Sequence, residues 1–233
     1  TSAVQVVAPS TSGNVLTSNG STWASTAPAP SGGVRSFTAT GTIGNGAIVT
    51  LKTDGTVKTV TKTVGSPTVG TEAVFKSATA SYIGATYDPD NSKVVIAYTD
   101  DDTGDYGQAV VGTVSGNTIT FGTPVTFASA ATWDVVVTYD TNSEKVVIAY
   151  RDAGNSYYGT AIVGTVSGDS ISFGSEVVYE SANAAKQSIA FDSNLNKIVV
   201  AYVDYGNSQY VTAAVGTVSG TSISFGTPVI VYN

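Results

Sequence analysis

The residue types best suited to binding chemistry stand at one position of a repeated segment. The pair Ser81-Tyr82 becomes Trp133-Asp134 one repeat later and Ala185-Lys186 two repeats later. An aromatic face beside a few polar groups can bind a sugar or a peptide. We therefore predict ligand binding by the members of this set that carry such chemistry, which are Tyr82, Trp133, Asp134 and Lys186. Sequence drift at exposed positions is the alternative interpretation.

Tyrosines in the loops of the later repeats form a second candidate contact surface. Tyr157 and Tyr158 follow the most apolar segment of the second repeat, and Tyr205 follows that of the third. A tyrosine offers a large contact area at a low cost in side-chain entropy. We predict that these three residues contribute to ligand binding. The alternative is that they pair across strands and cover the rim of a sheet.

Aspartates begin the same loops and suggest two kinds of chemistry. Asp100, Asp152 and Asp204 occupy one position of the repeat, where a carboxylate can accept hydrogen bonds from the N–H groups of a turn. The acidic run of the first repeat also offers Asp100, Asp102 and Asp105 as candidate calcium ligands. Their spacing fits no EF-hand loop, and the other repeats lack the extra carboxylates. We predict no other metal site and no cofactor.

Composition argues against an enzyme. The 233 residues include no His and no Cys, which removes the usual nucleophile–base pairs, zinc sites and disulfides. Carboxylate pairs are plentiful, so residue types alone leave glycoside cleavage open. A sialidase, however, needs a cluster of arginines, and this chain has only Arg35 and Arg151. We predict that the protein is not an enzyme.

Charge and hydropathy limit the partners. The chain has 10 basic and 17 acidic residues and a net charge of −7, which argues against a surface that binds nucleic acid. No apolar run has the length of a membrane span, so we predict no membrane insertion. The sequence contains no Met, which predicts a fragment or a processed chain.

A repeat of 52 residues organises the rest of the sequence. The segment KVVIAY, a later GTVSG and a final SFG or TFG recur with fixed spacing, so that Tyr98, Tyr150 and Tyr202 are 52 residues apart. The copies span residues 76–127 (copy 1), 128–179 (copy 2) and 180–233 (copy 3). Each contains four strand candidates separated by turn residues. The KVVIAY segment is apolar throughout, which predicts a strand covered on both faces.

These features predict an all-β fold of propeller-like repeats, each a four-stranded antiparallel blade. An open stack of β-repeats is the structural alternative. Residues 35–75 are interpreted as a divergent blade of four strand-like pieces, the first RSFTATGTI and the last VGTEAVF, with a hairpin signal at Asp54-Gly55. The repeat domain then spans residues 35–233. Residues 1–34 have the composition of a linker. Within them, Ser18-Asn19-Gly20 predicts a short hairpin, and we predict Trp23 as an oligomer contact. A flexible tether is the alternative for this segment.

Two parts of the chain resemble proteins of tailed phages. GNVLTSNGSTWASTAPAP resembles the linker-and-hairpin segments of tail fibres and other virion appendages. ATYDPDNSKVVIAYTD and GTVSGNTITFGTPV resemble repeat arrays in structural proteins of marine phages, notably cyanophages. The resemblance implies a location on the virion surface, outside the cell. It also implies a homo-oligomer, with a trimer favoured, and other virion proteins as partners.

The resemblance further implies a host-surface glycan or protein as the target, bound by a non-enzymatic tail fibre or similar appendage. One alternative is a purely structural capsid decoration or tail component that binds only virion proteins. A bacterial surface adhesin or lectin is the other alternative.

Overall fold

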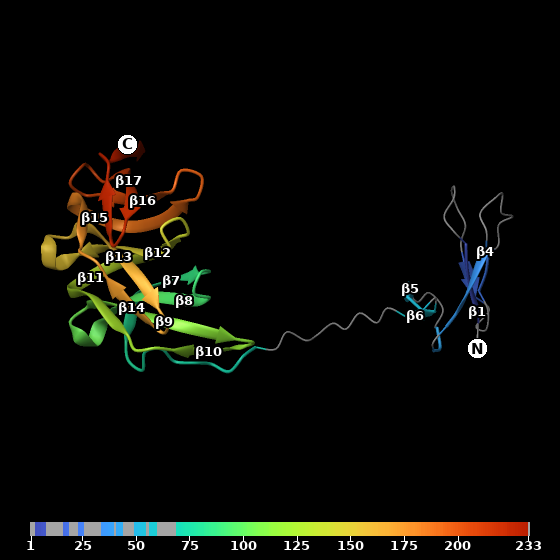
Figure 1. Ribbon diagram of the computed structural model, residues 1–233. Coiled ribbons are helices and arrows are strands. Elements are labelled where there is room, and N and C mark those ends of the chain that lie inside the picture. Colours follow the sequence, from blue (N-terminus) through green and yellow to red (C-terminus); the bar gives the residue numbers. More distant parts are fainter. Residues whose placement is uncertain are drawn as a thin grey trace. The chain divides into compact units, whose positions relative to one another are not determined.

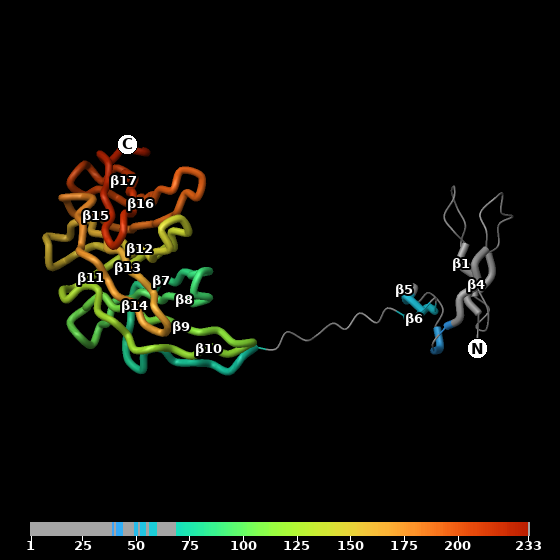
Figure 2. The backbone as a smooth tube through the Cα atoms, in the orientation of Figure 1, coloured from blue at the N-terminus to red at the C-terminus, as the bar shows by residue number. Residues whose placement is uncertain are grey.

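The structure is a computed structural model that describes residues 69–232 and parts of the N-terminal segment, namely 3–7, 16–18, 23–25, 34–39, 41–43, 49–54 and 56–59. Contacts divide the chain into two units, Thr1–Pro67 and Thr68–Asn233, and Figure 2 traces the backbone of each. The boundary that we predicted after residue 34 stays a prediction. No helix among the described residues is long and apolar enough to cross a membrane.

A four-stranded sheet, in the order β2-β3-β1-β4, lies in the first unit. Strands β2 (Leu16–Ser18) and β3 (Trp23–Ser25) pair antiparallel, which confirms the predicted hairpin. Strand β1 (Ala3–Val7) pairs with β4 (Val34–Thr38) and, in parallel, with β3. Linker composition had not predicted β1. The side chain of Trp23 lies outside the described residues, so its predicted oligomer contact stays a prediction.

A second hairpin in this unit joins β5 (Val49–Leu51) to β6 (Val57–Thr59). The turn is held by Asp54, whose Oδ1 accepts hydrogen bonds from the backbone N (2.9 Å) and the Oγ1 (2.6 Å) of Thr56. These hydrogen bonds hold the pKa of the Asp54 carboxyl below its ordinary value. The Asp54-Gly55 turn signal therefore predicted this hairpin correctly.

Residues 35–75 do not form one four-stranded sheet among the described residues. The first predicted strand, in β4, pairs with β1, whereas β5 and β6 pair with each other. The last predicted strand, within residues 69–75, has no regular secondary structure. The physical reason is that short β-prone pieces carry little information about their partners, because pairing is decided by non-local contacts.

The second unit contains a continuous array of thirteen antiparallel strands (Figure 1). The strands are β7 (Ala80–Asp88), β8 (Lys93–Asp100), β9 (Tyr106–Ser115), β10 (Thr118–Phe121), β11 (Val125–Asp140), β12 (Lys145–Asp152), β13 (Tyr158–Ser167), β14 (Ser170–Phe173), β15 (Val177–Asp192), β16 (Lys197–Asp204), β17 (Tyr210–Ser219), β18 (Ser222–Phe225) and β19 (Val229–Tyr232). Two 3₁₀ turns, η1 (Asp101–Thr103) and η2 (Ala153–Asn155), follow β8 and β12. The predicted all-β class is confirmed for the described residues.

One pairing pattern recurs in each copy. In copy 1, β7 pairs with β8, β8 with β9, and β9 with both β10 and the first half of β11. The second half of β11 then pairs with β12, so this strand closes copy 1 and opens copy 2. Strand β15 joins copies 2 and 3 in the same way. Pro124, which cannot donate to a ladder, falls in the break between β10 and β11.

Stacking of the copies buries the KVVIAY strand of copy 2 on both faces. Val146, Ile148 and Tyr150 belong to a buried cluster shared with copy 1. Val147 and Ala149 point the other way, into a cluster shared with copy 3. All five side chains are fully buried, as predicted. Each Val or Ile buried in this way contributes roughly 1.5–3 kcal/mol, which a copy without a neighbour would lose.

An aromatic side chain fastens each copy to the next. Phe127 packs against Tyr150 and Phe173 with centroid distances of 5.3 and 5.8 Å. Tyr179 contacts Tyr202 and Phe225 in the same way, at 5.3 Å from each ring. Phe75, one period before Phe127, packs against Tyr98 (5.3 Å) and Phe121 (5.8 Å). Residues near Phe75 therefore give copy 1 the contact that copies 2 and 3 receive from the copy before them.

Glycines let the copies approach closely beside each of these rings. A Cβ added at Gly122 would overlap the carbonyl oxygen of Asp169, and one added at Gly174 would overlap that of Thr221. Gly70 stands in the same relation to Asn117. The recurring GTP or GSE segment thus has a packing role, because only a residue without a side chain fits against the backbone of the next copy.

Candidate ligand-binding rim

The predicted ligand residues share a backbone feature. Tyr82, Asp134 and Lys186 all have left-handed φ values, of 46°, 52° and 54°. Each lies in a shift of register, where the first strand of its copy bulges against the second. A bulge re-aims side chains, and bulges are common beside functional sites. A positive φ is costly for residues of these types, so the surrounding sheet must hold the bulge in place.

Two of the bulges are in direct contact. The backbone N of Lys186 donates a hydrogen bond to Oδ2 of Asp134 at 3.2 Å, across the junction between copies 2 and 3. Tyr82 is exposed on copy 1. Among the described residues it makes no hydrogen bond or ring contact with the other members of the predicted set. The structure thus joins Asp134 and Lys186 by a hydrogen bond and shows no such bond to Tyr82.

An aromatic and cationic cluster lies beside the copy 2 bulge. The rings of Trp133 and Tyr157 are stacked, with centroids 5.2 Å apart and planes inclined by 25°. The Cζ atom of Arg151 lies 5.0 Å from the Trp133 ring and 4.8 Å from the Tyr157 ring. These are cation–π distances. Tyr157 is 38% exposed, so the cluster reaches solvent. We call Trp133, Arg151 and Tyr157 the rim cluster.

Strand pairing and the loop position the rim cluster. Trp133 of β11 and Arg151 of β12 are direct cross-strand partners, which places their side chains on one face. Tyr157 follows η2, and its backbone N donates to the Asp152 carbonyl oxygen at 2.7 Å. Sequence analysis missed Arg151 as a site residue. A signal was present in the sequence: the position of Arg151 differs in chemistry between the copies, being Thr99 in copy 1 and Val203 in copy 3.

The other predicted tyrosines stand apart from the rim cluster. Tyr158 begins β13 and pairs with Asp152 and Asn183 in the sheet, where its side chain is half-buried. Tyr205 is exposed, and its backbone N donates to the carbonyl oxygen of Asn183 at 2.9 Å. Neither has a ring contact with another aromatic residue among those that the structure describes. Of the loop tyrosines that we predicted, Tyr157 is the one that joins Trp133.

Buried polar atoms without partners accompany the junction between copies 2 and 3. Gln187 is 8% exposed, and neither polar atom of its amide has a hydrogen-bond partner among the described residues. The hydroxyl of Tyr179 and Nε of Arg151 are buried and unpartnered in the same way. Burial raises the pKa of Tyr179 well above its ordinary value. The junction between copies 1 and 2 has Val135 and Phe127 at the positions of Gln187 and Tyr179.

The repeated loop aspartates hold their own turns. Oδ1 of Asp100 accepts a hydrogen bond from Asp102 N (3.2 Å), Oδ1 of Asp152 from Asn155 N (3.1 Å) and Oδ1 of Asp204 from Gly206 N (2.9 Å). The buried carboxylate of Asp100 also forms an ion pair with Lys76 at 2.7 Å, and Lys76 lies 3.3 Å from Asp102. The hydrogen bond to Asp100 raises the pKa of Lys76.

The calcium interpretation finds no support in this arrangement. No group of three His, Cys, Asp or Glu side chains among the described residues could hold a metal ion. Asp105, the third candidate ligand, is a turn residue with a φ of 64°. The ammonium group of Lys76 already lies between Asp100 and Asp102. The acidic run therefore binds the first residue of copy 1.

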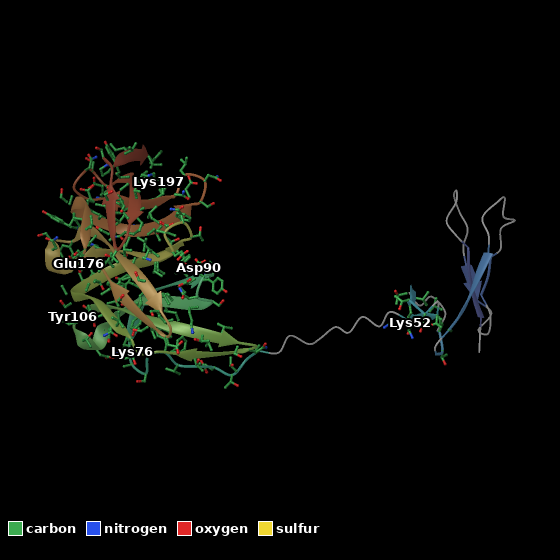
Figure 3. The ribbon with its side chains drawn as sticks, in the orientation of Figure 1. Lys52, Lys76, Asp90, Tyr106, Glu176 and Lys197 are labelled. Carbon is green, nitrogen blue, oxygen red and sulfur yellow. The ribbon has the colours of Figure 1, made fainter. Side chains whose placement is uncertain are left out.

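Buried tyrosines are hydrogen-bonded to carboxylates along the stack. Tyr150 donates to Glu176 at 2.7 Å, Tyr202 to Glu180 at 2.8 Å and Tyr139 to Asp90 at 2.6 Å. Figure 3 shows Glu176 and Asp90 on opposite sides of the second unit. Burial, and then the acceptor carboxylate, raises the pKa of all three tyrosines. A raised tyrosine pKa makes these hydroxyls unsuited to proton transfer at neutral pH.

Comparisons with known proteins identify no relative: no protein-family model, no curated protein and no solved structure matches the chain.

Proposed function

We propose that this protein is a non-enzymatic structural protein of a phage virion, a tail fibre or a similar appendage, exposed on the virion surface. Its partners are other virion proteins and further copies of itself. The support is the phage-like N-terminal and repeat segments, together with a surface built largely from Ser, Thr, Asn and Gly. The repeats also suit a spacer, because both internal junctions combine a buried apolar sheet face, an aromatic ring and a closely packed glycine.

We further propose that the copies are blades of a propeller-like array. Each has four antiparallel strand segments, and consecutive copies pack face to face through the two buried clusters. In this arrangement the bulged first strands of successive copies lie next to each other, as the Asp134–Lys186 hydrogen bond indicates. Because the copies carry different residues at the bulge, the neighbouring bulges together form a surface with aromatic, acidic and basic side chains.

The observation that carries a receptor-binding role is the rim cluster. Trp133 and Tyr157 offer aromatic faces at the edge of the stack, and Arg151, Asp134 and Lys186 add charged or polar groups nearby. Aromatic faces with a few polar groups are the usual lining of carbohydrate sites. We propose a host-surface glycan as the ligand class, with a host-surface protein as the other target of the same kind.

A glycan array and binding to host cell-envelope extract test this proposal. Trp133→Ala should weaken binding about 30-fold or more, as expected for the loss of a central aromatic anchor. Tyr87→Ala is the matched control, because Tyr87 is an exposed aromatic residue of copy 1 outside the rim cluster. It should bind like the wild-type chain. Thermal unfolding of both variants checks that the fold is kept.

A purely structural role is the second candidate, and exposed apolar strand residues of copy 3, such as Val211 (36% exposed) and Val215 (47% exposed), favour it. In that case the wild-type chain would bind purified virions tightly and would bind neither the glycans nor the host extract. Equal binding by Trp133→Ala and Tyr87→Ala would likewise count against the rim cluster as the receptor site.

A further inference from the structure

Copy 3 presents an apolar sheet face that no described residue covers. The side chains on this face alternate along the paired strands β16 and β17, which bear Val199, Ala201, Val203, Val211, Ala213 and Val215. None of the six is buried; Val211 is 36% and Val215 is 47% exposed. None is polar or charged. We call these six residues the copy 3 face. A contiguous exposed apolar patch on a water-soluble surface usually marks an interaction site.

Most of the same face is covered in the earlier copies. In copy 2, four of the six corresponding residues, Val147, Ala149, Ala161 and Val163, are fully buried against copy 3. In copy 1 the corresponding residues are buried against copy 2. The copy 3 face is therefore built like a surface that, elsewhere in this chain, is always packed against another sheet.

The copy 3 face lacks one of the features that hold a following copy, although copy 3 keeps Gly226 and the hydrogen bond from Lys197 to Thr217 at 2.8 Å, which correspond to Gly174 and to Lys93–Thr113. In copies 1 and 2 an aromatic ring covers a glycine, Phe127 over Gly107 and Tyr179 over Gly159. Copy 3 has Val211 in place of the glycine and Val231 in place of the ring. Val203 also replaces the polar Thr99 and Arg151 of the earlier copies. The result is a flatter and more apolar surface, suited to a different partner from a further repeat.

The opposite end of the stack is already partly occupied. Phe75 packs against Tyr98, Lys76 pairs with Asp100, and Gly70 lies against the backbone of Asn117. In the internal junctions these places are taken by the outer strand of the preceding copy. A second chain therefore cannot dock its copy 3 onto this end in the internal geometry without displacing residues 70–76.

We propose that the copy 3 face binds the same face of a second copy of this chain, related by a two-fold axis. The six residues carry no charge, and the ammonium group of Lys197 at the edge of the face is held by Thr217 Oγ1 at 2.8 Å, so no like charges meet at the centre of an isologous contact. The chain carries its net charge of −7 outside these six residues. Distant carboxylates of the two chains repel each other through solvent, so salt strengthens the association.

Native mass spectrometry and light scattering of the whole chain test the proposal. Ala213 lies at the centre of the face, paired with Ala201 on one side and Val229 on the other. Ala213→Glu should halve the assembly mass relative to the wild type and raise the dissociation constant about a hundredfold or more, because two buried like charges would meet. Ala85→Glu is the matched control, since Ala85 is an exposed strand residue on the outer face of copy 1.

The outcomes separate the partners. A wild-type mass twice that of Ala213→Glu, with Ala85→Glu unchanged, supports the proposal, whatever assembly the N-terminal segment makes. Mixing Ala213→Glu with Ala213→Lys should restore the doubled mass, which a misfolded variant could not do. Equal masses for wild type and Ala213→Glu would overturn it. Loss of the doubled mass in both Ala213→Glu and Ala85→Glu would indicate head-to-tail stacking and would also overturn it.

Discussion

Replacing Gly174 by Ala should loosen the junction between copies 2 and 3. The backbone N of Gly174 donates to the Val163 carbonyl oxygen at 2.9 Å, and an added Cβ would overlap the carbonyl oxygen of Thr221. The Cβ position is fixed by the backbone of residue 174 and the carbonyl oxygen belongs to the backbone of Thr221, so no side-chain rotation relieves the overlap. The two copies would have to separate locally by roughly 1 Å, which weakens their dispersion contacts.

The chain supplies a matched control for this substitution. Gly226 occupies the same position of copy 3, and its N donates to the Val215 carbonyl oxygen at 3.0 Å. A Cβ added there would meet nothing closer than 3.9 Å. Neither glycine has a positive φ, so the gain from restricting the unfolded chain is the same in both variants. The difference between the variants therefore isolates the contact with the next copy.

Overpacking typically costs 1–3 kcal/mol, and a clash with backbone belongs at the upper end of that range. We expect Gly174→Ala to lower the free energy of unfolding by about 3 kcal/mol relative to Gly226→Ala, and the Tm by about 6–12 °C. Urea unfolding followed by circular dichroism measures the difference, at protein concentrations where the mass is that of the dissociated chain. Stabilities within about 0.5 kcal/mol of each other would refute the close approach of the two copies.

Two further predictions concern buried and bridging groups of the second unit. Tyr179→Phe should raise the free energy of unfolding by about 1 kcal/mol in urea titrations, because it removes a buried hydroxyl without a partner. The substitution introduces the residue type that copy 1 has at this position, Phe127. Lower stability of the variant would mean that the hydroxyl of Tyr179 is hydrogen-bonded. Lys93 and then Thr113 hold the pKa of Asp169 below its ordinary value of 3.8, so its stabilising contribution is present above that pH and is lost as the pH falls through the lower folded value. Unfolding measured between about pH 5 and pH 2 should therefore show less loss of stability for Asp169→Asn than for the wild type, and parallel curves would contradict the Lys93 contact.

Local signals accounted for the strands of the copies. The apolar KVVIAY run, the alternating segments beside it and the Asp, Asn and Gly turns are short-range features, and the three copies repeat them. The strands and turns of the second unit follow these signals closely. The fusion of the fourth strand of one copy with the first strand of the next was not predicted. It depends on shifts of register within β11 and β15, where each strand passes from pairing with one copy to pairing with the next, and such long-range pairing has no local signal.

The candidate site was only partly predictable. Comparing the copies identified Trp133, Asp134, Tyr157 and Lys186, because substitutions within a repeat stand out against conserved scaffold positions. It missed Arg151, whose importance comes from its register opposite Trp133 and from the fold of the η2 loop onto both side chains. It also proposed calcium ligands where Lys76, at the start of copy 1, supplies the counter-charge.

The sequence by itself determined the class of the fold, the 52-residue period and the strands that must be covered on both faces. These properties follow from residue type and spacing, which act through the backbone of one copy. Only the tertiary structure decided which side chains of different copies meet, that Phe75 takes the place of the aromatic residue of a preceding copy, and that none of the six residues of the copy 3 face is buried by another described residue. Those outcomes depend on register and on sheet-on-sheet distance, and both are set by packing between segments far apart in the chain.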